Sequence, residues 1–319
     1  MFNFGLKNKI VVLLGEIMNF DVEKARIFEC ITGSRLYGTN TSESDYDYRG
    51  VCIPPMEILL HPFMNFDQKD SGFEEEDRSI YGLSKFFKLC ADANPNIVEL
   101  LFVPEKNILL ITSTWNKIID HRELFISKKA KFTFTGYAFS QLNAIKKHRQ
   151  WFINPPDRKP LREDFGLTDT PKISLALIKS METLNKDLLK DEYVDEFNKE
   201  KEYRKLKENW DHYQEWIRNR NPKRRELEEK YKYDCKHASH LFRLLTEGEE
   251  LLKTGKITFP LNNVEELLAI KNGLYTYDGV IEKAEEFEKK FNTWYDESQL
   301  QFGANIPELT KLYFECIGI

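Results

Sequence analysis

The chain has 319 residues, 41% hydrophobic and 31% charged, so it is long enough for one large or two ordinary domains with real cores. A formal net charge of −5 excludes a global basic field that would draw the whole chain to nucleic acid. Five scattered cysteines without a CxxC pair argue against a disulfide framework and against a cysteine zinc site.

The first twenty residues hold a short apolar run whose surroundings Lys7, Lys9 and Glu16 interrupt. This pattern predicts an amphipathic helix rather than a signal peptide. No window of about 20 apolar residues is present, so we expect no membrane-spanning segment. The cysteine usage is typical of a reducing compartment, and we therefore predict a cytoplasmic protein without a membrane partner.

The first third of the chain alternates short apolar segments with turns, which predicts a mixed α/β region. Strands are expected at residues 27–32, 46–53 and 77–81. The last of these runs into a helix through Cys90, which Asn94-Pro95-Asn96 ends, and an apolar helix or strand follows at residues 97–102.

After about residue 112 the apolar periodicity becomes helical. Helices are expected at residues 134–150, 173–190, 233–252 and 262–294, and a proline-rich loop at residues 154–171. The charged stretch at residues 191–232 is typical of a solvated helix pair packed by its interleaved aromatic side chains. The expected fold is α/β (α+β): a small mixed sheet with helices on one side in a domain of residues 1–125, followed by a helical domain of residues 126–319, with a cleft between the two.

The segment that carries chemistry lies at the ends of two predicted strands. Gly33-Ser34 directly follows the first strand, and Asp45-Tyr46-Asp47 begins at the edge of the next. Because side chains alternate along a strand, Asp45 and Asp47 are expected on one face while Tyr46 points to the core. Two carboxylates on one face repel each other unless a positive charge lies between them. Mg²⁺ with phosphate oxygens supplies that charge, so the spacing predicts a site for Mg²⁺ or Mn²⁺.

The Gly33-Ser34 turn is expected to open a short helix whose N–H groups hold a triphosphate beside the metal. Gly33 permits close backbone approach, and the Ser34 hydroxyl is suited to donate a hydrogen bond to phosphate. Arg35 and Gly38 follow in the same segment, and we predict that they also contact the nucleotide. Asp-x-Asp pairs are common in surface turns, but the order strand, Gly-Ser, helix and Asp-x-Asp strand is far more restrictive and favours a catalytic site.

This order resembles the Gly-Ser … Asp-x-Asp signature of the DNA polymerase beta-like nucleotidyltransferases. Within that superfamily the chain resembles one branch, the RlaP-like nucleotidyltransferases that are linked to RNA repair ligases and are also found in phages. The matching blocks are GSRLYGTNTSESDYDYRGV, DRSIYGLSKFFKLCADANPNIVELLFVP, GYAFSQL and KYDCKHASHLFRLLTEGEELLKTG. They lie between about residues 31 and 280 and so cover most of the chain.

The resemblance implies further site residues. The superfamily places a third carboxylate on a neighbouring strand, which here falls on Asp77, although the acidic run at residues 74–77 is also compatible with a solvated turn. Superfamily members often grip the triphosphate with a basic residue on a C-terminal helix, which implies nucleotide contacts for Lys236 and His237. The alternative for these two residues is an ordinary surface helix.

The resemblance implies a two-metal mechanism, in which Asp45, Asp47 and Asp77 bind the metal ions. A nucleoside monophosphate would move from a nucleoside triphosphate to an acceptor hydroxyl, expected on RNA, with release of pyrophosphate. The alternatives are a toxin-like transferase that modifies tRNA or a protein hydroxyl, and an inactive module that binds nucleotide or RNA. Basic clusters near aromatic residues at 146–151 and 218–225 are candidate RNA contacts, although such runs are more often helix faces or loops.

Overall fold

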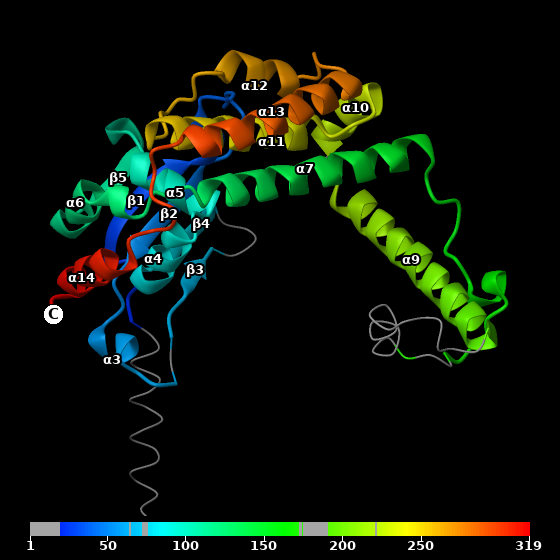
Figure 1. The fold of residues 1–319 in the computed structure, drawn as a ribbon, viewed down its shortest axis with the longest axis horizontal. Coiled ribbons are helices and arrows are strands. Elements are labelled where there is room, and N and C mark those ends of the chain that lie inside the picture. Colours follow the sequence, from blue (N-terminus) through cyan, green and yellow to red (C-terminus); the bar gives the residue numbers. More distant parts are fainter. Residues whose placement is uncertain (1–19, 64, 72–75, 172–173, 175–190, 221) are drawn as a thin grey trace, which may run out of the picture. The chain divides into compact units, whose positions relative to one another are not determined.

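The structure, a computed structural model, describes residues 20–63, 65–71, 76–171, 174, 191–220 and 222–319. The chain divides into two compact units, Met1–Asn143 with Cys235–Ile319, and Ala144–Asp234. The larger unit carries the sheet, and the described residues of the smaller unit are helices and loops (Figure 1). The catalytic and helical domains expected on either side of residue 125 stay a prediction.

The larger unit is built on a five-stranded sheet with the strand order β3-β4-β2-β1-β5. β2 and β4 run parallel, and the other neighbouring strands run antiparallel. The strands are β1 (Arg26–Thr32), β2 (Asp47–Cys52), β3 (Gln68–Asp70), β4 (Asp77–Gly82) and β5 (Ile108–Ile111). A mixed sheet combined with a C-terminal helical region confirms the predicted fold class.

The two faces of the sheet are covered differently. Phe28 of β1 is fully buried and is paired in register with Val51 of β2, so the two side chains share a face. The indole of Trp115, on α6 (Ser113–Asp120), stacks on Phe28 with ring centroids 3.9 Å apart. On the opposite face, Cys52 and Ile80 pack with residues just before β1. The helix-covered face is the one that carries the candidate site.

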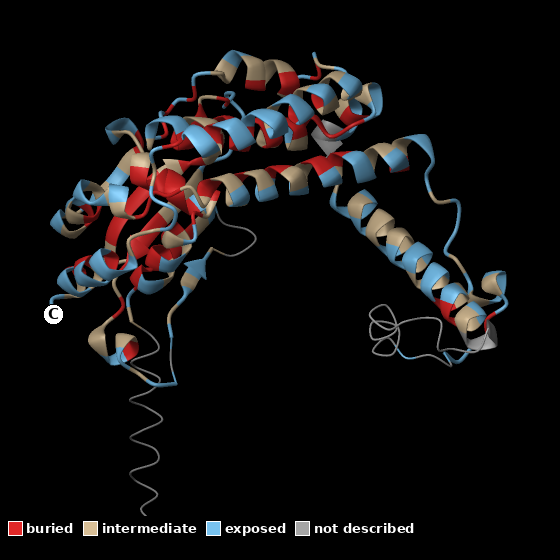
Figure 2. Ribbon diagram, in the orientation of Figure 1, coloured by how far each residue is buried: buried red, intermediate tan, exposed pale blue. Residues whose placement is uncertain are grey.

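Helices make up most of the rest of the larger unit, and Figure 2 shows that its buried residues concentrate in the sheet and in the elements packed on it. They are α2 (Gly33–Tyr37), α3 (Met56–Leu59), α4 (Leu83–Ala91), α5 (Pro95–Val98), α6, the first part of α7 (Ala130–Ile153), α11 (Cys235–Thr254), α12 (Val264–Lys271), α13 (Tyr277–Glu297) and α14 (Ile306–Ile317). Short 3-10 helices lie at Glu99–Phe102, Glu105–Asn107 and Arg122–Leu124.

In the smaller unit, the end of α7 is followed by a 3-10 helix at Arg162–Phe165, by α9 (Asp191–Asn219) and by α10 (Pro222–Tyr231). Trp151 of α7 is only 5% exposed. Its rings lie 5.6 Å from the ring of Tyr213 and 5.3 Å from that of Trp216, both on α9. Aromatic side chains of the charged stretch therefore pack against α7.

The structure adds two short strands that the sequence did not reveal. β3 is a polar edge strand of three residues and β5 has four residues, so neither is long enough for an alternating pattern to stand out. The helix expected in the first twenty residues falls almost entirely outside the described residues, and the one expected at 173–190 does so as well. Among the residues that the structure describes, no helix is both long and apolar enough to cross a membrane.

Candidate active site

Asp47 and Asp77, two of the predicted metal ligands, begin neighbouring strands. The parallel register of β2 and β4 pairs them directly, so both carboxylates project from the same face of the sheet. Asp47 is half-buried, whereas the side chain of Asp77 is 61% exposed. Asp45 is exposed and lies two residues before β2. The alternation of side chains along a strand, which predicted that Asp45 shares a face with Asp47, therefore does not apply to it. The structure thus brings together a pair separated by thirty residues of sequence.

Gly33 brings the Gly-Ser turn into contact with Asp47. It starts α2 directly after β1, with a left-handed φ of +62°. A Cβ at this position would lie 1.8 Å from Oδ2 of Asp47, so only glycine permits so close an approach. The side chain of Thr32 does not cap α2; its hydroxyl donates to the carbonyl of Asp47 at 3.3 Å. The carboxylate of Asp47 therefore lies against the start of the helix, where Ser34 follows.

Burial raises the pKa of Asp47 above its ordinary value, and the negative charge of Asp77 raises it further. The positive charges of Arg49 and Lys236 lower the pKa of Asp47, and Asp45 adds a smaller opposing effect. Because the net shift of this pKa is upward, the positive charges of Arg49 and Lys236 do not fully offset the effects of burial and of Asp77. A divalent cation between these oxygens would supply the missing positive charge.

Arg49 is a member of the site that the sequence analysis missed. It lies two residues after Asp47 on β2, and so on the same face. Its guanidinium donates to both carboxylate oxygens of Asp77, at 3.0 Å from Nη1 to Oδ1 and 3.3 Å from Nη2 to Oδ2. The signal was available, since a basic residue at this spacing from Asp47 has to share its face.

The loop between α2 and β2 is braced by Arg35. Its guanidinium lies 3.6 Å from the ring centroid of Tyr46 and donates to the carbonyl of Ser44 at 2.8 Å. Tyr46 is 42% exposed, so the expectation that it points into the core is wrong. The physical reason is that Tyr46 precedes the first paired residue of β2, and its ring lies between Arg35 and the ring of Tyr48, whose centroid is 6.0 Å away. A nucleotide contact for Arg35 stays a prediction.

Gly38 ends α2 in a left-handed conformation with φ of +83°. A Cβ there would lie 2.8 Å from the Cβ of Pro260, so this glycine is required by the helix end and by packing. The helix end and the contact with Pro260 account for a glycine at this position without a bound ligand. The nucleotide contact of Gly38 remains a prediction.

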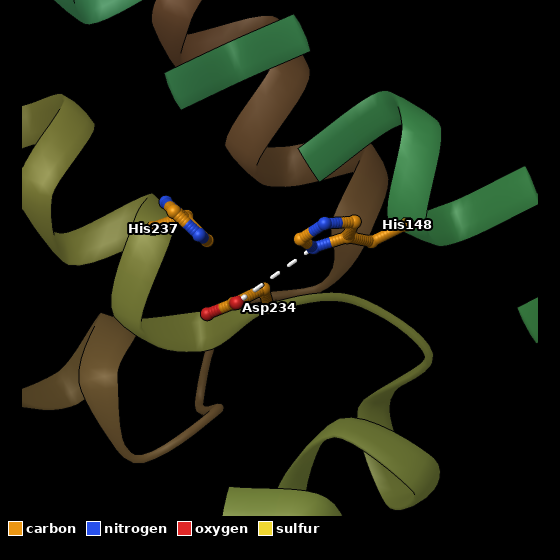
Figure 3. Close-up of side chains that lie close together, drawn as sticks. All are labelled: His148, Asp234 and His237. Atoms are coloured by element: carbon orange, nitrogen blue, oxygen red, sulfur yellow. Dashed lines mark ion pairs between the residues drawn. The ribbon is translucent and has the colours of Figure 1, made fainter. Parts of the chain in front are cut away.

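The two predicted residues on α11 have different surroundings. Lys236 is close enough to Asp47 for its positive charge to lower the pKa of that carboxyl. His237 has its Nδ1 2.5 Å from Oε1 of Gln141 on α7. Just before α11, Asp234 forms an ion pair within the smaller unit, 3.8 Å from its Oδ2 to Nδ1 of His148 (Figure 3). The structure therefore associates Lys236 with the carboxylates and gives His237 a hydrogen-bond partner on a helix.

A buried ionic network connects α11 to α2 and to the 3-10 helix at Glu99–Phe102. Arg243 is 6% exposed and donates to Glu99 at 3.2 Å and to Glu247 at 3.1 Å. The hydroxyl of Tyr37, the last residue of α2, donates to Glu99 at 3.0 Å. Burial raises the pKa of Glu99 to about 8, and Arg243 opposes that shift. Because Lys236 and Arg243 are two helical turns apart, they share a face of α11, and the buried network fixes the helix that carries Lys236.

The basic clusters proposed as RNA contacts are partly explained by internal contacts of the smaller unit. Lys147 bonds the ring of His212 at 2.8 Å, and the neighbouring Trp151 is buried. Arg220 pairs with Glu228 at 2.5 Å. These side chains pack and neutralise neighbours, which is the more common role of such runs.

A mixed sheet with a Gly-Ser turn at the end of one strand and an aspartate pair at the start of two neighbouring strands is the arrangement expected of a polymerase beta-like nucleotidyltransferase. Residues 12–153 match the model of the family described as RlaP, the RNA repair pathway DNA polymerase beta family. This match confirms the resemblance inferred from the sequence, and it covers the Gly-Ser turn and the aspartates. It ends before α11, so Lys236 lies beyond it.

The chain is also similar to an uncharacterized 38.9 kDa protein in the nrdC-mobD intergenic region of Enterobacteria phage T4. The two are 32% identical over 119 residues, which cover 34% of this chain and 35% of the phage protein. The matched part thus spans about a third of that relative's length. No solved structure matches the chain.

Proposed function

We propose that the chain is a metal-dependent nucleotidyltransferase, which moves a nucleoside monophosphate from a nucleoside triphosphate to an acceptor hydroxyl on RNA and releases pyrophosphate. The observation that carries the proposal is the pairing of Asp47 with Asp77 beside the Gly33 turn. The family match over the same residues supports nucleotidyl transfer as the reaction class.

The residues present suit Mg²⁺ or Mn²⁺. Both cations prefer oxygen ligands, and Mg²⁺ is commonly held by one or two carboxylates together with substrate phosphates. Burial and the neighbouring Asp77 raise the pKa of Asp47, so the ionised form of Asp47 is disfavoured in the metal-free protein. Asp47 and Asp77 would hold the ions, with Asp45 from the preceding loop, and the ions would neutralise charge that develops on the transferred phosphate.

The chain's own groups bind and orient the reactants. Backbone N–H groups at Gly33-Ser34 donate hydrogen bonds to phosphate oxygens, and the ammonium of Lys236 adds positive charge near Asp47. The acceptor oxygen forms a bond to the α-phosphorus while the bond to the bridging oxygen breaks, and pyrophosphate leaves with that electron pair. The carboxylate of Asp77, which is more exposed than that of Asp47, accepts the hydroxyl proton.

Two measurements test the proposal in sequence. Calorimetry with each of the four nucleoside triphosphates plus Mg²⁺ or Mn²⁺ should reveal binding of at least one. The same nucleotides carrying an α-phosphate label are then incubated with RNA and with protein acceptors. Label on RNA is expected. Label on protein alone would favour the toxin-like transferase, and nucleotide binding without any transfer would favour the inactive module.

Asp47→Asn is the decisive variant, because asparagine keeps the shape of the side chain and removes the charge that holds the ions. Loss of that charge in the transition state should reduce transfer about a thousandfold, or about 4 kcal/mol. Asp120→Asn, on an exposed position at the end of α6, is the matched control and should retain full transfer. If Asp47→Asn keeps more than about a tenth of wild-type transfer, the two-metal assignment is wrong.

A further inference from the structure

Arg49 places a positive charge beside the two carboxylates of the candidate site. Its side chain is 22% exposed, and it lies on the sheet face shared by Asp47 and Asp77. Both carboxylate oxygens of Asp77 accept from it. Two carboxylate oxygens engaged by one guanidinium form a bidentate pair, which is the strongest geometry for such a contact.

The guanidinium is also held by the backbone. Nη1 of Arg49 donates to the carbonyl of Tyr48 at 2.7 Å and to the carbonyl of Asp77 at 3.2 Å. These two bonds do not involve the carboxylate of Asp77, so they remain available when that carboxylate turns away. Arg49 is therefore fixed beside the site whether or not it keeps its bond to the side chain of Asp77.

A metal ion and the guanidinium of Arg49 compete for the same oxygens. Each Asp77 oxygen that accepts from Nη1 or Nη2 keeps a second lone pair, but a cation that coordinates there lies next to the guanidinium, and the two positive charges repel each other.

We propose that Arg49 is a positioning residue that holds Asp77 in the metal-free site and opposes the binding of a divalent cation there. This inference rests on the proposed function. The consequence is coupled binding: the metal alone binds weakly, and it binds well when it arrives with the phosphates of a nucleotide, whose negative charge offsets the positive charge of Arg49. Metal ions then bind together with the nucleotide rather than before the nucleotide binds.

The test measures Mn²⁺ binding to the full chain without nucleotide, by calorimetry or by the paramagnetic signal of free Mn²⁺. Arg49→Gln removes the competing charge and should bind Mn²⁺ about tenfold more tightly than wild type, which corresponds to about 1.4 kcal/mol. Arg49→Lys keeps a positive charge at the position and should stay closer to wild type. Lys69→Gln removes a positive charge from β3 of the same sheet, away from Asp77, and should leave the affinity for Mn²⁺ unchanged.

A double-mutant cycle shows whether Arg49 acts through Asp77. In the Asp77→Asn background, Arg49→Gln should bring no further gain in Mn²⁺ affinity, because the oxygen pair for which it competes is gone. An equal gain in both backgrounds, or no gain from Arg49→Gln in the wild-type background, would overturn the inference while leaving nucleotidyl transfer untouched. Failure of the wild type to bind Mn²⁺ even with nucleoside triphosphates would instead refute the proposed function.

Discussion

Gly33→Ala tests the contact between the Gly-Ser turn and the aspartate pair. Two costs can be read from the structure. The left-handed φ of +62° disfavours any residue with a Cβ by about 1–2 kcal/mol. The new Cβ would also lie 1.8 Å from Oδ2 of Asp47, far inside van der Waals contact, so the carboxylate has to rotate away at a cost of about 0.5–1.5 kcal/mol. The free energy of unfolding should therefore fall by roughly 1.5–3.5 kcal/mol.

The effect on transfer should be larger than the effect on stability. To reach ordinary contact distance, Oδ2 of Asp47 has to move by more than about 1 Å, and a displacement of that size at a reacting centre can cost about a hundredfold in rate. Gly255→Ala is the matched control, because Gly255 lies in the same unit with φ of +70° and its Cβ would meet only a leucine methyl group at 3.4 Å. The control should lose about 1–2 kcal/mol of stability and no transfer.

The assay compares both variants with wild type by chemical denaturation and by incorporation of α-labelled nucleotide at saturating metal. Gly33→Ala should lose at least about a hundredfold in transfer while remaining folded at 25 °C. If its transfer stays within about tenfold of the control, then Asp47 is not held against the turn in the reacting enzyme, and the geometry assigned to the site is wrong.

Three further outcomes follow from the same contacts. Asp47→Asn should raise the thermal midpoint of unfolding at pH 7 without metal. The pKa of Asp47 is raised in the folded protein, so the difference in midpoint between the variant and wild type should shrink as the pH falls through that pKa and Asp47 becomes protonated. Arg243→Ala should cost about 3–5 kcal/mol in denaturant unfolding, since it leaves Glu99 and Glu247 buried without their cation. Lys236→Ala should raise KM for the nucleoside triphosphate about tenfold in the transfer assay, and an unchanged KM would remove it from the site.

The sequence by itself determined the parts of the site that depend on local chemistry. A strand ending at Thr32 and a glycine directly after it predict a sharp turn into a helix, and Gly33 indeed adopts a left-handed conformation there. A strand at residues 77–81 was also expected, although the sequence alone left the acidic run at its start open as a solvated turn. Long helices such as α11 were predictable because their apolar periodicity persists over several turns.

Only the tertiary structure decided which of these parts meet. Parallel pairing of β2 with β4 places Asp77 beside Asp47, and no local pattern encodes that register. It also decided that Arg49 pairs with Asp77, and that Arg243 of α11 pairs with Glu99, 144 residues away. The physical reason is that strand pairing and buried ion pairs are settled by which surfaces pack together, whereas turns and helix faces are settled by each residue's own backbone preference and spacing.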